Sequence, residues 1–165
     1  MVINGKPRLA CDTKLSSCRN GRLRLEPLRK FPAVRDLMVD RSVMMENLRR
    51  IGMWLEENAV PSQKTEELAY EASRCLQCGC CLEVCPNFYA GGSFFSASAV
   101  VPSTRIIAEL PGKSGYEILK NYRKNIYNGC GKSLSCSKVC PAEIDVQHLL
   151  VQSNAAAVWK RFFKK

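Results

Sequence analysis

The residues of this chain best suited to chemistry are its cysteines, which number ten in 165 residues. Five lie between Cys75 and Cys85, and three lie between Cys130 and Cys140. Cysteines so close in sequence cannot easily pair with one another. The N-terminus also shows no apolar segment of the kind that a secretory signal needs. The pattern therefore favours metal ligation over a disulfide scaffold.

The first cysteine stretch reads Cys75-Leu-Gln-Cys78-Gly-Cys80-Cys81-Leu-Glu-Val-Cys85-Pro86. Cysteines 75, 78, 81 and 85 have the spacing of the bacterial ferredoxin run. Three thiolates spaced three residues apart on a tight loop can reach three iron corners of one cubane. A glycine at position 79 lets the loop take a positive φ, so that backbone amides can point at the sulfides.

The second stretch reads Cys130-Gly-Lys-Ser133-Leu-Ser-Cys136-Ser-Lys-Val-Cys140-Pro141. It follows the same run except that Ser133 stands where the second cysteine belongs. One iron corner would therefore have no thiolate. A cluster that lacks one cysteine favours a three-iron, four-sulfide centre, because the unliganded iron is easily lost.

The fourth cysteine of each run ligates the other cluster in two-cluster ferredoxins. This crossing rule predicts two ligand sets. A [4Fe–4S] cluster would be held by Cys75, Cys78, Cys81 and Cys140. A [3Fe–4S] cluster would be held by Cys85, Cys130 and Cys136. Cys80 has no ligand duty in this scheme.

Zinc and inert structural thiols are the competing interpretations of these cysteines. Two zinc sites would need four ligands each, and the seven cysteines do not divide in that way. A zinc-stabilised, basic nucleic-acid-binding module is the alternative function of a different class, since the net charge is +10. The basic residues are scattered, however, and no aromatic-interleaved basic motif occurs, so no nucleic-acid partner is expected.

The remaining pattern predicts a mainly α fold with a small β-rich start. Asn4-Gly5 predicts a hairpin turn between Val2-Ile3 and Leu9-Ala10, and Asn20-Gly21 predicts a second turn. Apolar residues from about Arg35 to Leu55 recur at helical spacing. Further helices are expected near 62–75, with Ser62 as its cap, and near 98–110, where Pro102 either kinks the helix or marks its start. Two more are expected near 116–127 and 145–163, with Asp145 capping the last.

No apolar run approaches the roughly 20 residues that a membrane-spanning helix needs. The last helix is expected to close the core, with a solvated basic end. His148 has no evident carboxylate or metal partner, so solvent exposure or a local hydrogen bond is expected for it. No phosphate loop, dinucleotide fingerprint or catalytic nucleophile is evident, so no catalytic residue is predicted in this chain.

A complete ferredoxin run followed by a run that lacks its second cysteine resembles the iron–sulfur subunit of succinate dehydrogenase and fumarate reductase. Residues 3–11 look like the end of that family's plant-type [2Fe–2S] β-grasp domain, and residues 31–40 look like its link to the helical part. The resemblance implies a remnant of a [2Fe–2S] domain at 1–34. A helical ferredoxin-like domain with [4Fe–4S] and [3Fe–4S] clusters would follow at 35–165.

The resemblance also implies an electron-transfer role without substrate catalysis by this chain. Electrons in that family pass between a FAD-containing catalytic subunit and a membrane quinone bound with anchor subunits. The implied location is peripheral, on the cytoplasmic face of the inner membrane or on the matrix side of a mitochondrion. An iron–sulfur subunit of another flavin-dependent complex, of the glycolate oxidase or heterodisulfide reductase type, is the runner-up. Such subunits usually carry two complete runs, and Ser133 argues against them.

Two departures from the family pattern concern Cys11 and Gly131. Of the family's four [2Fe–2S] ligands only the last, Cys11, has a counterpart, so this chain is expected to hold that cluster only if a missing N-terminal part or a separate [2Fe–2S] chain supplies the other three. Cys18 matches no ligand position and is interpreted as structural. Gly131 occupies a position that is histidine in many quinone-reactive members, and the aromatic residues expected near the quinone are only approximated by Phe88 and Tyr89.

Overall fold

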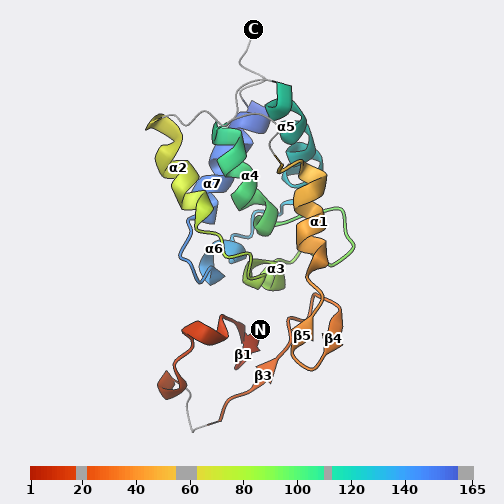
Figure 1. Cartoon of the computed structure of the whole chain (residues 1–165), viewed down its shortest axis with the longest axis vertical. Helices are drawn as coiled ribbons and strands as arrows, with labels where there is room; N and C mark the ends of the chain where they lie inside the picture. Colours follow the sequence, from red (N-terminus) through yellow and green to blue (C-terminus); the bar gives the residue numbers. More distant parts are fainter. Residues whose placement is uncertain (18–21, 55–62, 110–112, 160–165) are drawn as a thin grey trace.

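The computed structural model describes residues 1–17, 22–54, 63–109 and 113–159. Short strands form one end of the molecule and helices form the rest (Figure 1). This confirms the mainly α fold with a small β-rich start. The expected turn at Asn20-Gly21 lies outside the described residues.

The β-rich start is a three-stranded antiparallel sheet in the order β2-β1-β3, formed by β1 (Val2–Ile3), β2 (Lys6–Pro7) and β3 (Leu25–Glu26). The Asn4-Gly5 turn is confirmed, and both of its residues have positive φ, at 49° and 78°. The return strand is Lys6–Pro7 and not the expected Leu9-Ala10. The chain continues from there into two 3₁₀ turns, η1 (Ala10–Asp12) and η2 (Leu15–Ser17).

The helix expected from about Arg35 begins later. A hairpin of β4 (Ala33–Arg35) and β5 (Met38–Val39) comes first, and α1 spans Ser42–Ile51. The local reason is Asp40, whose carboxylate accepts a hydrogen bond from the backbone N–H of Ser42 at 2.8 Å. This bond lowers the pKa of Asp40. The helix ends at Gly52, which has the left-handed φ of 88° common after a helix.

Four longer helical segments build the body. They are α2 (Gln63–Ser73), α4 (Ala97–Glu109), α5 (Lys113–Asn125) and α7 (Val146–Asn154), the last continued by the π-helical turn η5 (Ala155–Trp159). Helix α4 lies at the centre, against α1, α2, α5 and α7 (Figure 1). The cap at Asp145 is confirmed, since its carboxylate accepts from the N–H of His148 at 2.9 Å. The proposed cap Ser62 and residues 160–163 lie outside the described residues.

Buried polar pairs fix how these helices meet. The hydroxyl groups of Thr104 and Ser153 lie 2.7 Å apart between α4 and α7, and the Tyr122 hydroxyl donates to the Asn154 side chain at 3.0 Å. Around them packs the main apolar cluster, which includes Phe95, Ile118 and Ile126. Burial of polar groups is tolerable here because each has a partner.

Pro102 lies inside α4 and does not mark the start of this helix, which begins five residues earlier at Ala97. A proline has no backbone N–H, so it cannot donate to the carbonyl of the residue four positions before it. That carbonyl belongs to Ser98. The carbonyl oxygen of Ser98 can therefore accept a hydrogen bond from a donor outside the helix.

Two short helices lie at the end of the helical body nearest the strands, α3 (Cys80–Val84) and α6 (Ser135–Val139), and α3 contacts both α6 and β2 (Figure 1). An apolar cluster of Val2, Leu28, Phe31, Met44, Leu82 and Phe88 connects strand, loop and helix residues across this junction. Lys30 donates two hydrogen bonds across this junction. Its backbone N–H donates to the Glu83 carboxylate, and the ammonium group of Lys30 donates to the carbonyl of Cys85.

Gly79 is the tightest point of this junction and generates a prediction. Its φ is +84°, and a Cβ there would lie 3.2 Å from Leu28 Cδ1 and 3.4 Å from Phe31 Cζ. Gly5 has a similar φ of +78° but no atom within 4 Å of such a Cβ. We expect Gly5→Ala to destabilise the chain by about 1 kcal/mol through backbone strain alone. Gly79→Ala should lower the thermal unfolding midpoint clearly more than Gly5→Ala does. Equal losses would show that the contact with Leu28 and Phe31 adds nothing.

Candidate metal centre

The two cysteine motifs fold as a structural repeat with an offset of 55 residues. Positive φ occurs at the third and fifth positions of each motif, which are Gln77, Gly79, Lys132 and Leu134. Helices α3 and α6 begin at the next positions, and each is followed by its motif's last cysteine in extended backbone. Ser133 therefore occupies the position in the second motif that Cys78 occupies in the first.

A first pocket, with about 430 Å³ of space between the atoms, is lined by four thiols. Three come from the first motif, Cys75, Cys78 and Cys81, and the fourth is Cys140 from the second. The rest of the lining is mostly apolar, with Val101 and Ile144 among its residues. The structure thus brings together the four cysteines that the sequence assigned to one cluster.

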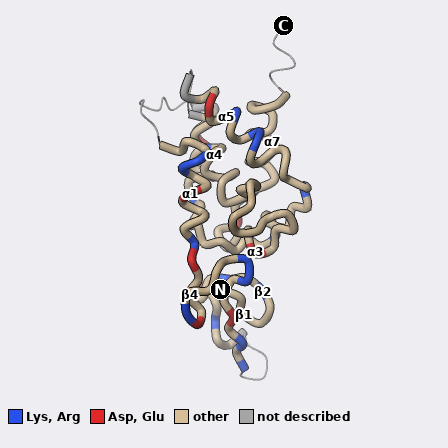
Figure 2. The backbone as a smooth tube through the Cα atoms, turned by 90° about the vertical axis from the view of Figure 1, so that its right-hand side faces the viewer, with Lys and Arg blue, Asp and Glu red and all other residues tan. Residues whose placement is uncertain are grey.

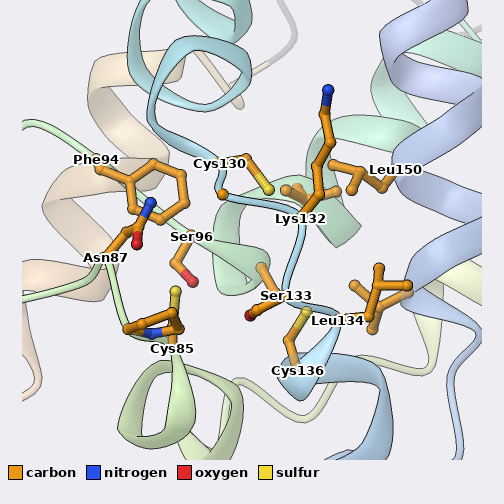
Figure 3. Close-up of a pocket in the computed structure, with 15 residues that line it drawn as sticks. Cys85, Asn87, Phe94, Ser96, Cys130, Lys132, Ser133, Leu134, Cys136 and Leu150 are labelled. Carbon is orange, nitrogen blue, oxygen red and sulfur yellow. The ribbon is translucent and has the colours of Figure 1, made fainter.

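A second pocket, of about 450 Å³, is lined by Cys85, Cys130 and Cys136 together with Ser133. The three thiols come from different segments and their sulfur atoms point toward the same space (Figure 3). These are the three cysteines assigned to the other cluster. In the described part of the chain no three Cys, His, Asp or Glu side chains are arranged to hold a single metal ion.

The exchange of cysteines between motifs is held in place by three hydrogen bonds. Asn87 donates to the carbonyl of Gly129 at 2.7 Å, which keeps the chain after Cys85 beside the second motif. Arg74 donates to the carbonyl of Ala142 at 2.5 Å. Glu71 accepts from the N–H of Asp145 at 3.0 Å. The last two bonds keep the chain after the final cysteine beside α2 and the first motif.

Burial dominates the electrostatics of these thiols. It raises the pKa of Cys75 and Cys136, and it raises that of Cys81 well above its ordinary value, with further increases from neighbouring thiolates. A hydrogen bond between Cys78 and Cys80 lowers the pKa of Cys78 and raises that of Cys80. Metal ligation requires thiolates, so positive charge in the pockets would offset the cost of ionising these groups. The donor sets, four thiols in one pocket and three with a serine in the other, fit two iron–sulfur clusters.

The two pockets are neighbours. Ala97 and Val146 line both, so the two spaces share part of their lining. Cys81 and Cys136 are close enough for the charge of one to affect the pKa of the other. Groups bound in the two pockets would therefore lie close to each other.

Several other predicted residues lie away from the pockets. Cys80 is buried, with 1% of its surface exposed, and lines neither pocket. Cys11 is an exposed thiol in η1, and Cys18 lies outside the described residues. His148 is exposed and pairs with Gln152 at 3.1 Å, as expected from its lack of other partners.

The surroundings of Gly131 are also specific. A Cβ at this position would lie 3.1 Å from the Asn87 amide nitrogen. Phe88 is buried against Phe31, with ring centroids 5.9 Å apart, whereas Tyr89 is 67% exposed. Of the two aromatic residues expected near a quinone, only Tyr89 is therefore at the surface.

Sequence reasoning missed Gln77, whose side chain donates to Cys75 Sγ at 3.3 Å and to the carbonyl of Ser98 at 2.9 Å. The available signal was Pro102, which frees that carbonyl within its helix.

Two domain families match this chain. Residues 1–46 match the 2Fe-2S iron-sulfur cluster binding domain, and residues 71–144 match the 4Fe-4S dicluster domain. The cysteine pockets and these matches make the chain similar to iron–sulfur proteins with a 4Fe-4S dicluster domain.

The chain is also similar to iron–sulfur subunits of succinate dehydrogenase and fumarate reductase. It is 34% identical to the succinate dehydrogenase iron–sulfur subunit of Bacillus subtilis (strain 168), over 93% of this chain and 64% of that protein. It is 31% identical to the fumarate reductase iron–sulfur subunit of Haemophilus influenzae, over 88% and 64%. These similarities confirm the resemblance inferred from the sequence.

Two further similarities extend over almost the whole chain. The uncharacterized iron–sulfur protein MJ0092 of Methanocaldococcus jannaschii is 34% identical over 98% of this chain and 33% of its own length. A chain of the Mycobacterium smegmatis Sdh1 complex in the apo form shares the fold, with a TM-score of 0.79 and 22% identity, over 98% of this chain and 72% of that chain. The chain thus spans less than two thirds of the first two curated relatives named.

Gly129, which precedes Cys130, generates a second prediction. A Cβ there would lie 2.5 Å from Phe94 Cδ2 and 3.0 Å from Phe94 Cβ, so the bulk of Phe94 would have to move. We expect Gly129→Ala to destabilise the full chain by about 1–3 kcal/mol through overpacking. The thermal unfolding midpoint is the measurement.

Gly131→Ala is the matched control two residues further along. The added Cβ would meet only the end of the Asn87 side chain, at 3.1 Å, so this variant should lose less stability than Gly129→Ala. A Gly129→Ala midpoint as high as that of the control would contradict the tight contact with Phe94.

Proposed function

We propose that this chain is the electron-transfer iron–sulfur subunit of a succinate:quinone or fumarate:quinone oxidoreductase. The observation that carries the proposal is the division of seven thiols between two adjoining pockets, four in one and three with Ser133 in the other. The relatives named as succinate dehydrogenase and fumarate reductase subunits support it.

The proposed ligands follow the two thiol sets. Cys75, Cys78, Cys81 and Cys140 would hold a [4Fe–4S] cluster. Cys85, Cys130 and Cys136 would hold a [3Fe–4S] cluster. These clusters would supply reversible one-electron chemistry. The protein's part is to present the thiolates, to keep water out with apolar walls, and to place the two pockets side by side with Ala97 and Val146 in both linings.

Substrate chemistry and quinone chemistry would belong to partners. We propose a FAD-containing catalytic subunit on one side and membrane anchor subunits with a quinone on the other. A separate chain or segment would supply the other three ligands of any [2Fe–2S] cluster at Cys11. The chain would sit peripherally, on the cytoplasmic face of the inner membrane or on the matrix side of a mitochondrion.

Three structural observations bear on these partners. Within the described residues no helix is long and apolar enough to cross a membrane. Basic side chains are spread along the molecule from the β end to the helical end (Figure 2). This distribution does not favour a nucleic-acid face. The proposed division into a [2Fe–2S]-type part at 1–34 and a dicluster part at 35–165 follows the resemblance.

Electron paramagnetic resonance of protein purified without oxygen, with iron and sulfide counts, tests the cluster content. We expect a sharp three-iron signal in the oxidised sample and a four-iron signal after strong reduction. Two four-iron signals without an oxidised three-iron signal would favour the runner-up flavin-dependent complexes. A colourless protein loaded with zinc would reject the iron–sulfur function.

Ser133→Cys tests the reason for the three-iron centre. The repeat places this residue where Cys78 lies in the first motif, so a cysteine there would present a fourth thiolate to the second pocket. We expect the oxidised three-iron signal to be largely lost and iron to rise by about one atom per chain, since a four-cysteine site holds a four-iron cluster. Ser133→Ala, which supplies no thiolate, should keep the three-iron signal. Persistence of that signal in the cysteine variant would contradict the assignment.

A further inference from the structure

The side chain of Gln77 connects the first cysteine motif to helix α4. Gln77 lies half-buried in the loop before α3, with a positive φ of 49°. Its amide nitrogen is 3.3 Å from Cys75 Sγ and 2.9 Å from the carbonyl oxygen of Ser98. An amide nitrogen carries two hydrogens, so it can donate to both acceptors at once.

Helix α4 determines which way this amide points. In an α-helix the carbonyl of residue 98 would accept from the N–H of residue 102, but that residue is Pro102 and has no N–H. The Ser98 carbonyl can only accept, so the nitrogen of the Gln77 amide and not its oxygen must face it. The second hydrogen of this nitrogen is thereby directed at the sulfur.

The sulfur of Cys75 accepts the second hydrogen, across the 3.3 Å contact with the Gln77 amide nitrogen. A hydrogen bond to a thiolate favours its negative form. Hydrogen bonds to ligand sulfurs likewise favour the more negative, reduced form of a bound cluster and raise its reduction potential.

The second motif lacks this arrangement at the equivalent position. Lys132 also has a positive φ, of 54°, but its ammonium group lies over the ring of Tyr127, 5.7 Å from the ring centroid. Figure 3 shows this side chain extending away from the sulfur atoms of the pocket. The amide donor is thus a feature by which the first pocket differs from the second.

We propose that Gln77 is a positioning residue that raises the reduction potential of the cluster held at Cys75, by donating a hydrogen bond to the ligand sulfur while the Ser98 carbonyl holds its amide in place. The inference rests on the proposed function, because it requires a cluster ligated by Cys75. One electron taken from an external reductant adds one negative charge to the cluster and its sulfur ligands. No bond is made or broken and no proton is taken up. Gln77 therefore acts on the reduction potential only through its hydrogen bond, which is stronger when the cluster is reduced than when it is oxidised.

The test is a potentiometric titration of the full chain in its complex, with dithionite as reductant and the four-iron signal followed by electron paramagnetic resonance. Gln77→Met removes the donor at similar volume. We expect the ratio of reduced to oxidised four-iron cluster to fall about threefold to tenfold at a fixed potential, where tenfold corresponds to about 59 mV for a one-electron couple. The three-iron potential should not move.

Gln77→Glu and Tyr70→Phe complete the set. The glutamate has the size of glutamine, cannot donate when ionised, and adds negative charge, so it should lower the potential further. It also provides the test if Gln77→Met fails to assemble a cluster. Tyr70 is 69% exposed and lines neither pocket, so Tyr70→Phe should leave the potential unchanged.

Three outcomes separate the possible failures. An unchanged four-iron potential in both Gln77 variants overturns the inference. A lower amount of bound cluster with an unchanged potential also overturns the inference, because Gln77 would then only stabilise the contact between the loop and α4. Absence of any four-iron signal from the unmodified protein rejects the proposed function itself.

Discussion

A thiolate is costly in an apolar pocket unless positive charge lies against it. The burial of Cys75, Cys81 and Cys136 imposes that cost on both pockets of this chain at once. If metal binds at these thiols, its binding is coupled to folding, because ligands must lose protons to bind. Helices α3 and α6 and the hydrogen bonds between the two motifs bring these groups together.

The β-rich start takes part in the same arrangement. Leu82 lies within α3, between two cysteines that line different pockets, and it packs with Val2, Leu28 and Phe31 in one apolar cluster. The carbonyl of Cys85 accepts from the Lys30 ammonium group. The β-rich start thus packs against the outer side of the first motif. A structural change in the β-rich start would therefore alter the positions of the thiols.

The sequence could predict which cysteines meet because ligand spacing is a local property of a tight loop. Ser133 needed only the comparison of one motif with the other, and the crossing of Cys85 and Cys140 followed from the rule for two-cluster ferredoxins. The start of α1 could not be read from periodicity, since the hairpin residues before Ser42 also include apolar residues at helical intervals. The contact between Gln77 and Ser98 depends on how α4 packs against a distant loop, and no spacing along the chain encodes that distance.

Because each pocket takes cysteines from both motifs, neither half of the chain contains a complete set of thiols. The first pocket lacks its fourth thiol until Cys140 is in place, and the second lacks two of its three until Cys130 and Cys136 arrive. During synthesis on the ribosome, both pockets must therefore stay incomplete until the second motif has emerged. The exchange of cysteines makes the order of the two motifs along the chain also an order in time, in which the first motif waits for the second.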